Sequence, residues 1–195
     1  MRQKWYTNTS MNRRMTMKAA LVTMNVKAGQ CAENVQYMKQ QIKRAKEDGA
    51  DLIVFPQNAV SGYLLGDVWL DEDFCRYADS FNDELIRESE DIAIVWGNIR
   101  YRNRRRFNAA FFAYQKKTHM RVKQNELLPY IQDALYFEEN PINSAIEYKE
   151  DMVFALNFGD EIQLADMNIN LDARPYDMQK AYHPHGNVIY VNACG

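Results

Sequence analysis

The sequence predicts an α/β fold in which helices cover a sheet. Residues 51–55 (Asp-Leu-Ile-Val-Phe) form a short apolar run that is typical of a strand buried on both faces. Residues 30–48 carry apolar side chains at helical spacing, and residues 19–24 form another apolar run before them. A strand, a helix and a second strand over this distance indicate a right-handed βαβ unit.

Length and composition are those of an ordinary globular domain. The chain has 195 residues, of which 47% are hydrophobic and 26% are charged, so it can bury a sizeable core. A formal net charge of -2 gives no overall electrostatic reason to bind nucleic acid or an anionic membrane. No apolar run approaches the length that spans a bilayer, and the basic N-terminus lacks the apolar segment of a secretory signal.

The three cysteines are an odd number without close pairing, which argues against a disulfide framework and predicts a reducing, cytoplasmic location. We expect Cys31 and Cys75 to pack rather than react. Cys194 follows the last expected strand, and His183 and His185 precede that strand, so a relocated Cys–His site is an alternative. We expect no metal site and no cofactor, because no Cys or carboxylate spacing accompanies the histidines.

The chain is expected to begin with a flexible extension. Residues 1–16 are polar and basic, and a domain at residues 17–195 follows them. A partner-binding arm is the alternative for these first residues. In the domain, residues 19–24 are the first expected strand and residues 30–48 the first helix. One face of that helix is apolar and carries Val35, Met38, Ile42 and Ala45.

The middle of the chain predicts a helix and two strands. Residues 69–87 are expected to be helical, and residues 92–96 and 107–114 are expected to be strands. The basic run at residues 100–106 (Arg-Tyr-Arg-Asn-Arg-Arg-Arg) lies between these strands and is expected to be a solvated hairpin loop. A nucleic-acid patch is the alternative, which one short cluster on a nearly neutral chain does not favour.

The last third of the chain predicts a hairpin, a helix and a final strand. Residues 152–156 and 161–164 are expected to pair as a β-hairpin. Residues 177–185 are expected to form a short helix, and residues 186–192 (Gly-Asn-Val-Ile-Tyr-Val-Asn) a strand.

Several of these segments together resemble one protein family. Residues 49–63 (Gly-Ala-Asp-Leu-Ile-Val-Phe-Pro-Gln-Asn-Ala-Val-Ser-Gly-Tyr) resemble the first catalytic motif of the nitrilase, or carbon–nitrogen hydrolase, superfamily. Residues 66–70 (Gly-Asp-Val-Trp-Leu) are most similar to the glutaminase domain of glutamine-dependent NAD synthetases. The resemblance implies an α-β-β-α sandwich that pairs into dimers. It also implies a domain that is shortened at the C-terminus, since the family's domain continues with further strands.

The resemblance also implies a catalytic glutamate, which this chain lacks at the matching position. The family has a Glu directly after the Pro of the first motif, where it acts as general base. Here that position is Gln57. A carboxamide has no useful basicity near neutral pH, so it cannot accept a proton from a thiol.

The family's lysine motif is altered too. In residues 123–130 (Lys-Gln-Asn-Glu-Leu-Leu-Pro-Tyr) the position expected for the oxyanion-stabilising Lys, counted back from the Pro, is held by Asn125. Lys123 stands two residues earlier, and on a strand that offset moves the amine by about 6–7 Å. Asp133 stands where the family has a supporting Glu.

No cysteine stands at the family's nucleophile position in either of two alignments. In one alignment Ala165 replaces the nucleophilic Cys that ends a strand. In the other, residues 165–170 match the strand that follows the Cys helix, and residues 170–176 match the family's next turn. This second alignment uses more residues, and it implies that the segment with the nucleophile and its helix is missing.

These departures from the family's catalytic motifs lead to three hypotheses for function. The first is a catalytically inactive nitrilase-like domain that serves as a scaffold, oligomer subunit or binding module, either as a homo-oligomer or with a protein partner. The second is an active glutamine amidase that supplies ammonia for NAD synthesis. It requires Lys123 or another amine, and a carboxylate such as Asp133 or Glu126, to converge on a cysteine. The third is retained binding of a small amide in a pocket lined by four residues: Gln57, Tyr63, Asn125 and Tyr130.

Overall fold

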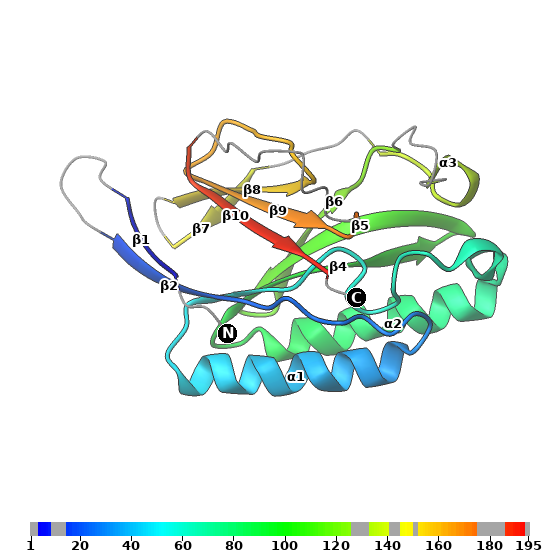
Figure 1. Cartoon of the computed structure of the whole chain (residues 1–195), viewed down its shortest axis with the longest axis horizontal. Coiled ribbons are helices and arrows are strands. Elements are labelled where there is room, and N and C mark those ends of the chain that lie inside the picture. Colours follow the sequence, from blue (N-terminus) through cyan, green and yellow to red (C-terminus); the bar gives the residue numbers. More distant parts are fainter. Residues whose placement is uncertain are drawn as a thin grey trace.

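Two mixed β-sheets lie face to face, and two helices cover the outer face of the larger sheet (Figure 1). The computed structural model describes six stretches of the chain: residues 4–8, 15–125, 133–140, 145–149, 152–174 and 186–193. The predicted α/β fold with a sheet-on-sheet sandwich is confirmed.

The larger sheet has the strand order β1-β2-β3-β4-β5-β6. Its strands are β1 (Lys4–Asn8), β2 (Met15–Leu21), β3 (Leu52–Val54), β4 (Ala93–Arg102), β5 (Arg105–Tyr114) and β6 (Lys117–Val122). The strands β2, β3 and β4 run parallel, with Ile53 in register with Ala20 on one side and Ile94 on the other. All three residues of β3 are buried, as the apolar run predicts.

The two long helices form one layer below this sheet (Figure 1). The helical elements are α1 (Cys31–Glu47), the 3-10 helix η1 (Gly66–Leu70), α2 (Glu72–Glu88) and the short α3 (Asp133–Tyr136). The predicted helix at residues 30–48 is confirmed as α1, and its predicted apolar face is buried. The predicted helix at residues 69–87 is instead divided at Asp71, whose carboxylate accepts hydrogen bonds from the backbone of Asp73 and caps α2.

A buried asparagine fixes α2 on the sheet. The Asn82 side-chain amide donates to the Ile99 carbonyl oxygen at 2.9 Å, and its oxygen accepts from the Trp96 indole at 2.9 Å. The Asn98 amide donates to the same oxygen and to the Ala78 carbonyl. These bonds join α2 to β4 in an otherwise apolar layer, so they specify how the helix sits on the sheet.

The smaller sheet has the order β10-β9-β8-β7. Its strands are β7 (Ile146–Tyr148), β8 (Met152–Phe158), β9 (Met167–Asp172) and β10 (Val188–Asn192). The strands β8, β9 and β10 are parallel, and only β7 is antiparallel to its neighbour. Alternate residues of these strands point inward, where Phe154 packs against Phe112 of β5 with ring centroids 5.9 Å apart.

The predicted hairpin at residues 152–156 and 161–164 is wrong. The first strand continues to Phe158, and residues 161–164 form no strand. Residues 159–166 instead cross the outer face of the smaller sheet. The Asn170 amide donates to the carbonyl oxygens of Gly159 at 2.9 Å and Glu161 at 2.6 Å, and Asn168 exchanges hydrogen bonds with Gln163. Buried amides on β9 therefore hold this crossing loop against the sheet.

The basic run at residues 100–106 is not a loop. The strands β4 and β5 extend through it, and only Asn103 and Arg104 form the turn, both with positive φ (54° and 60°). Positive φ at both central residues is typical of the type I′ turn, whose twist suits a two-residue hairpin.

The N-terminal part differs from the expected elements. The first strand of the domain is Met15–Leu21 rather than residues 19–24, and residues 4–8 pair with it as an antiparallel edge strand. The division of the chain at residue 16 stays a prediction. The helix expected at residues 177–185 lies outside the described residues. In the described part of the chain, no helix is both long and apolar enough to cross a membrane.

Gly97 of β4 lies against the turn that follows β3. A Cβ added at Gly97 would lie 2.5 Å from the Asn58 nitrogen and 2.5 Å from the Gln57 Cα. Both are backbone atoms, so neither can move aside without shifting the turn. The backbone of Gly97 also donates to the Pro56 carbonyl oxygen at 3.1 Å. The turn and the strand are therefore in direct backbone contact.

We expect Gly97→Ala to lower the free energy of unfolding by about 3 kcal/mol, because the methyl group forces the turn off β4. Gly49→Ala is the matched control: its Cβ meets open space, so only the left-handed backbone (φ 69°) costs about 1 kcal/mol. Urea unfolding of both variants measures the difference. Equal losses would mean that the close approach at Gly97 does not constrain the fold.

Candidate functional site at the strand ends

The turn after β3 brings Gln57 to the meeting point of the two sheets. Gln57 is 2% exposed, and its backbone N–H donates to the Asp172 carbonyl oxygen at the end of β9, at 3.3 Å. The carboxyl ends of parallel strands are where α/β folds usually place their chemistry. Gln57 therefore follows the end of β3 and lies beside the end of β9.

Several buried amides near Gln57 lack a hydrogen-bond partner in the described part of the chain. They include Nε2 of Gln57 and both side-chain polar atoms of Asn58 and Asn108. The carbonyl oxygen of Asn108 accepts from the backbone N–H of Lys123 at 2.8 Å, which places Asn108 beside the end of β6. An unpaired buried polar atom lowers the stability of the folded protein by about 1–3 kcal/mol. The binding of a ligand whose polar group forms a hydrogen bond to such an atom would therefore be favoured.

Lys123, Asp133 and Tyr63 form a buried cluster. The Lys123 Nζ lies 2.5 Å from Oδ2 of Asp133, and the Tyr63 hydroxyl donates to Oδ1 of Asp133 at 3.0 Å. The side chains of Lys123 and Asp133 are 4% and 2% exposed. The structure thus brings together an amine, a carboxylate and a phenol from the end of β6, the start of α3 and the turn after β3. Sequence reasoning named all three residues but did not predict this ion pair.

Asn125 does not join this cluster. Its backbone N–H donates to the Glu139 carboxylate at 2.7 Å, and its side-chain amide donates to the Phe137 carbonyl oxygen at 3.1 Å. Asn125 therefore anchors the chain beyond β6. Its assignment to the family's lysine position stays a prediction, and the amine that lies in the cluster belongs to Lys123.

Ala165 lies on the loop between β8 and β9, two residues before β9 begins. The described residues 159–166 form no strand, and β9 follows them in parallel to β8. The choice between the two alignments stays a prediction.

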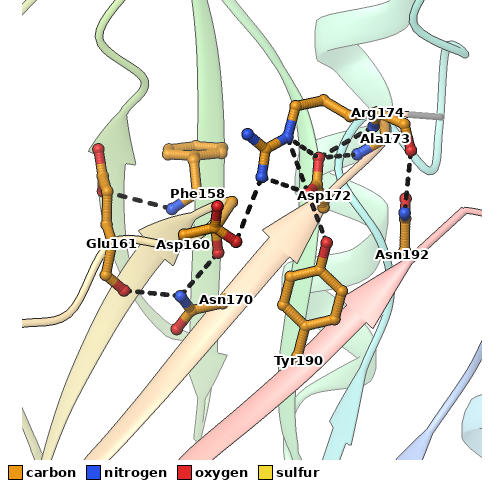
Figure 2. A network of polar contacts seen from close by, with 10 residues as sticks. Phe158, Asp160, Glu161, Asn170, Asp172, Ala173, Arg174, Tyr190 and Asn192 are labelled. Carbon is orange, nitrogen blue, oxygen red and sulfur yellow. Dashed lines mark hydrogen bonds and ion pairs between the residues drawn. The ribbon is translucent and has the colours of Figure 1, made fainter. Parts of the chain in front are cut away.

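A charged network fills the region directly after β8 (Figure 2). The Arg174 guanidinium donates to both carboxylate oxygens of Asp172, at 2.8–3.0 Å, and its Nη2 lies 3.6 Å from Asp160. The Tyr190 hydroxyl donates to Asp172 at 2.5 Å. The guanidinium also lies where any side chain at Gly159 would have to go. Sequence reasoning missed this network, since neither an Asp nor an Arg in a turn signals its partner.

The network lowers the pKa of Asp172. Burial alone would raise the pKa of this carboxyl group, but the hydrogen bonds from Arg174 and Tyr190 stabilise the charged form and outweigh it. Burial and the neighbouring Asp172 together raise the pKa of the Tyr190 phenol. The carboxylate and the phenol therefore stay in their ordinary charge states near neutral pH.

The two cysteines in the described part of the chain lie elsewhere. Cys31 begins α1 and Cys75 lies in α2, where its thiol donates to the Trp69 carbonyl oxygen. Burial raises the pKa of each thiol to about 11. Thiols with such a pKa are almost wholly protonated at neutral pH and are poor nucleophiles.

The remaining residues named from sequence lie outside the described residues. These are Tyr130, His183, His185 and Cys194. Within the described stretches, no group of three or more His, Cys, Asp or Glu side chains could hold a metal ion.

We expect Lys123→Met to lower the free energy of unfolding by about 3–5 kcal/mol, because it leaves the Asp133 carboxylate buried without its cation. Lys27→Met removes one partner of the exposed pair with Glu33 (side chains 63% and 56% exposed) and should cost less than about 1 kcal/mol. Chemical denaturation compares the two. The double variant Lys123→Met/Asp133→Leu should recover part of the loss. A cost for Lys123→Met as small as that of the control would contradict the buried pair.

The lowered pKa of Asp172 predicts a pH-dependent contribution to stability. The group is more acidic when folded, so its contribution is present above its unfolded pKa of about 3.9 and is lost as pH falls through the folded value. The difference in unfolding free energy between wild type and Asp172→Asn should therefore shrink below about pH 4. Tyr190→Phe, which removes one stabilising hydrogen bond, should shift this loss to higher pH. A difference that does not change with pH would refute the assignment.

Known proteins share this architecture. A glutamine-dependent NAD(+) synthetase from Acinetobacter baylyi (strain ADP1) is 26% identical over 182 residues, which cover 86% of this chain and 33% of that protein. The chain thus spans about a third of the length of this curated relative.

Solved structures show the same fold. A glutamine-dependent NAD(+) synthetase from Cytophaga hutchinsonii aligns with a TM-score of 0.78 and 15% identity, over 92% of this chain and 36% of that one. An amidase of the nitrilase superfamily from Nesterenkonia sp. AN1 aligns with a TM-score of 0.80 and 18% identity, over 92% of this chain and 77% of that one. Residues 18–151 match the sequence profile of the carbon-nitrogen hydrolases. The chain therefore belongs to the carbon–nitrogen hydrolase (nitrilase) family.

Proposed function

We propose that this domain does not hydrolyse amides by the route of its family and serves as a binding module or oligomer subunit in the cytoplasm. The observation that carries the proposal is the connection between β8 and β9. Residues 159–166 contain no cysteine, and the Arg174 guanidinium occupies the space directly after β8. Cysteine-dependent amide hydrolysis needs a thiolate, a base and an oxyanion stabiliser at one point.

The base position supports the same proposal. Gln57 is buried beside the ends of β3 and β9, and its place directly after Pro56 is the one that the family's motif gives to Glu. A carboxamide cannot accept the thiol proton near neutral pH. Substituting the base and the nucleophile together removes both partners of the proton transfer, and such groups act as a unit.

The Lys123–Asp133 pair takes a structural role in this proposal. Each charge neutralises the other, and the Tyr63 hydrogen bond satisfies the second carboxylate oxygen. The unpaired amides of Gln57 and Asn108 nearby are suited to a small amide ligand, which they could meet as hydrogen-bond donors and acceptors. Among the described strands, β6 and β10 each end a sheet, and at such an edge a second copy or a protein partner could dock through the backbone.

An active glutamine amidase is the second candidate, because Lys123 and Asp133 do converge as that hypothesis requires. The curated relative from Acinetobacter baylyi is by its name a glutamine-dependent NAD(+) synthetase, so an ammonia-supplying amidase is the activity to test. This candidate needs a reactive cysteine beside the pair. Cys31 and Cys75 are buried in the helical layer, which leaves Cys194.

A covalent label separates the two candidates. Incubation with a diazo-ketone analogue of glutamine, followed by intact-mass and peptide mass spectrometry, should give no adduct on this protein. The Acinetobacter baylyi synthetase, treated in parallel, is the control for reagent activity. A single adduct on Cys194 that disappears in Cys194→Ala would overturn the proposal and establish the amidase.

A further inference from the structure

A groove opens on the helix-covered face of the larger sheet, beside its β6 edge. It has a volume of about 290 Å³, and Lys123 is not among its lining residues. Its lining residues come from β4, β5, β6 and the chain after α3: Arg100, Arg102, Phe107, Thr118, Met120, Val122 and Asn140. Nothing in the proposed function uses this groove.

The floor of the groove is apolar. Phe107 of β5 is paired with Arg100 of β4, and Met120 of β6 is paired with Phe111 of β5, so these side chains share one face. The helix α2 covers the part of this face around Trp96, which stacks on Phe111 at 5.1 Å. Met120 lies beyond that cover and is 37% exposed. The groove thus presents an aromatic ring and a polarisable thioether to solvent.

The rim of the groove is cationic. Arg100 lies 3.4 Å from Asp79 of α2 and 5.2 Å from the centroid of Phe111, so its charge is compensated and its orientation is fixed. Arg102 is exposed and forms no ion pair with any residue in the described part of the chain. The guanidinium of Arg102 therefore stands at the mouth of an apolar groove, with no carboxylate partner among the described residues.

We propose that this groove binds a small organic anion with a flat aromatic body, such as an aryl phosphate. The planar guanidinium of Arg102 matches the oxygens of a phosphate or carboxylate, with two parallel hydrogen bonds. Phe107 and Met120 would receive the aromatic ring. The volume lies at the lower end of the range for small-molecule sites, so it suits a one- or two-ring compound.

The other arginines of the hairpin do not extend the site into a basic surface for nucleic acid. Arg105 lies over the Phe107 ring, with its guanidinium 5.3 Å from the ring centroid, and it pairs with Glu138 at 2.5 Å. Arg104 lies 4.0 Å from Glu72. The Arg106 side chain donates to the Tyr136 carbonyl oxygen at 3.2 Å. Local partners therefore engage the guanidinium groups of Arg104, Arg105 and Arg106, so among the described arginines of this hairpin it is Arg102 whose position favours an anion.

Isothermal titration calorimetry with naphthyl phosphate tests the proposal. We expect saturable binding, with inorganic phosphate and naphthol each binding at least about tenfold more weakly, because each supplies half of the contacts. No heat with naphthyl phosphate would overturn the proposal. Equally tight binding of inorganic phosphate or of naphthol would overturn the ligand class.

Two charge-reversed variants locate the site. Arg102→Glu should weaken naphthyl phosphate at least about tenfold, since it places a carboxylate against the phosphate. Arg104→Glu changes the net charge equally but lies on the turn outside the groove, so its effect should stay below about twofold. Both side chains are exposed, and unchanged melting temperatures confirm folding. Equal weakening in the two variants would mean that only long-range electrostatic attraction holds naphthyl phosphate, and it would refute the site.

Discussion

The backbone turn that follows β3 determines how the two sheets meet. The Pro56 carbonyl oxygen accepts from Gly97 in the larger sheet, and the Gln57 N–H donates to Asp172 in the smaller sheet. Both interactions use main-chain groups, and the close approach at Gly97 also involves backbone atoms alone. The side chain at position 57 can therefore change without altering the turn, so the framework of the family can persist while its chemistry changes.

Buried charges at the ends of the strands are compensated by partners on other elements. Lys123 follows β6 and pairs with Asp133 of α3, while Asp172 of β9 is bound by Arg174 and by Tyr190 of β10. Such pairs add little net stability, because desolvation offsets most of the attraction. Their main effect is to specify which helices and strands pack together, whereas the two apolar cores supply the driving force for folding.

Local patterns in the sequence predicted the parts of the fold that depend on local physics. The apolar face of α1 and the buried run of β3 follow from periodicity alone. The same reasoning predicted a strand at residues 161–164, and there it is wrong. Ile162 and Leu164 are exposed to solvent, and the side of this loop that faces the sheet is held by buried amides of β9. Counting back to Asn125 assumes a fixed step along the chain, which the contact between Lys123 and Asp133 does not test. Ion pairs between different helices and strands produce no periodic pattern in the sequence, so the sequence alone does not predict them.

The loop between β8 and β9 is short for the path that it must follow. Phe158 pairs with Leu171, four residues beyond the start of β9, so the chain must return about 13 Å along the sheet and pass over its side chains. Eight residues in a helix advance only about 12 Å, whereas eight extended residues reach about 27 Å. Only an extended path can make the return. The length of the loop therefore excludes a helix from this crossing. Along an extended path, alternate side chains such as Leu164 must face outward.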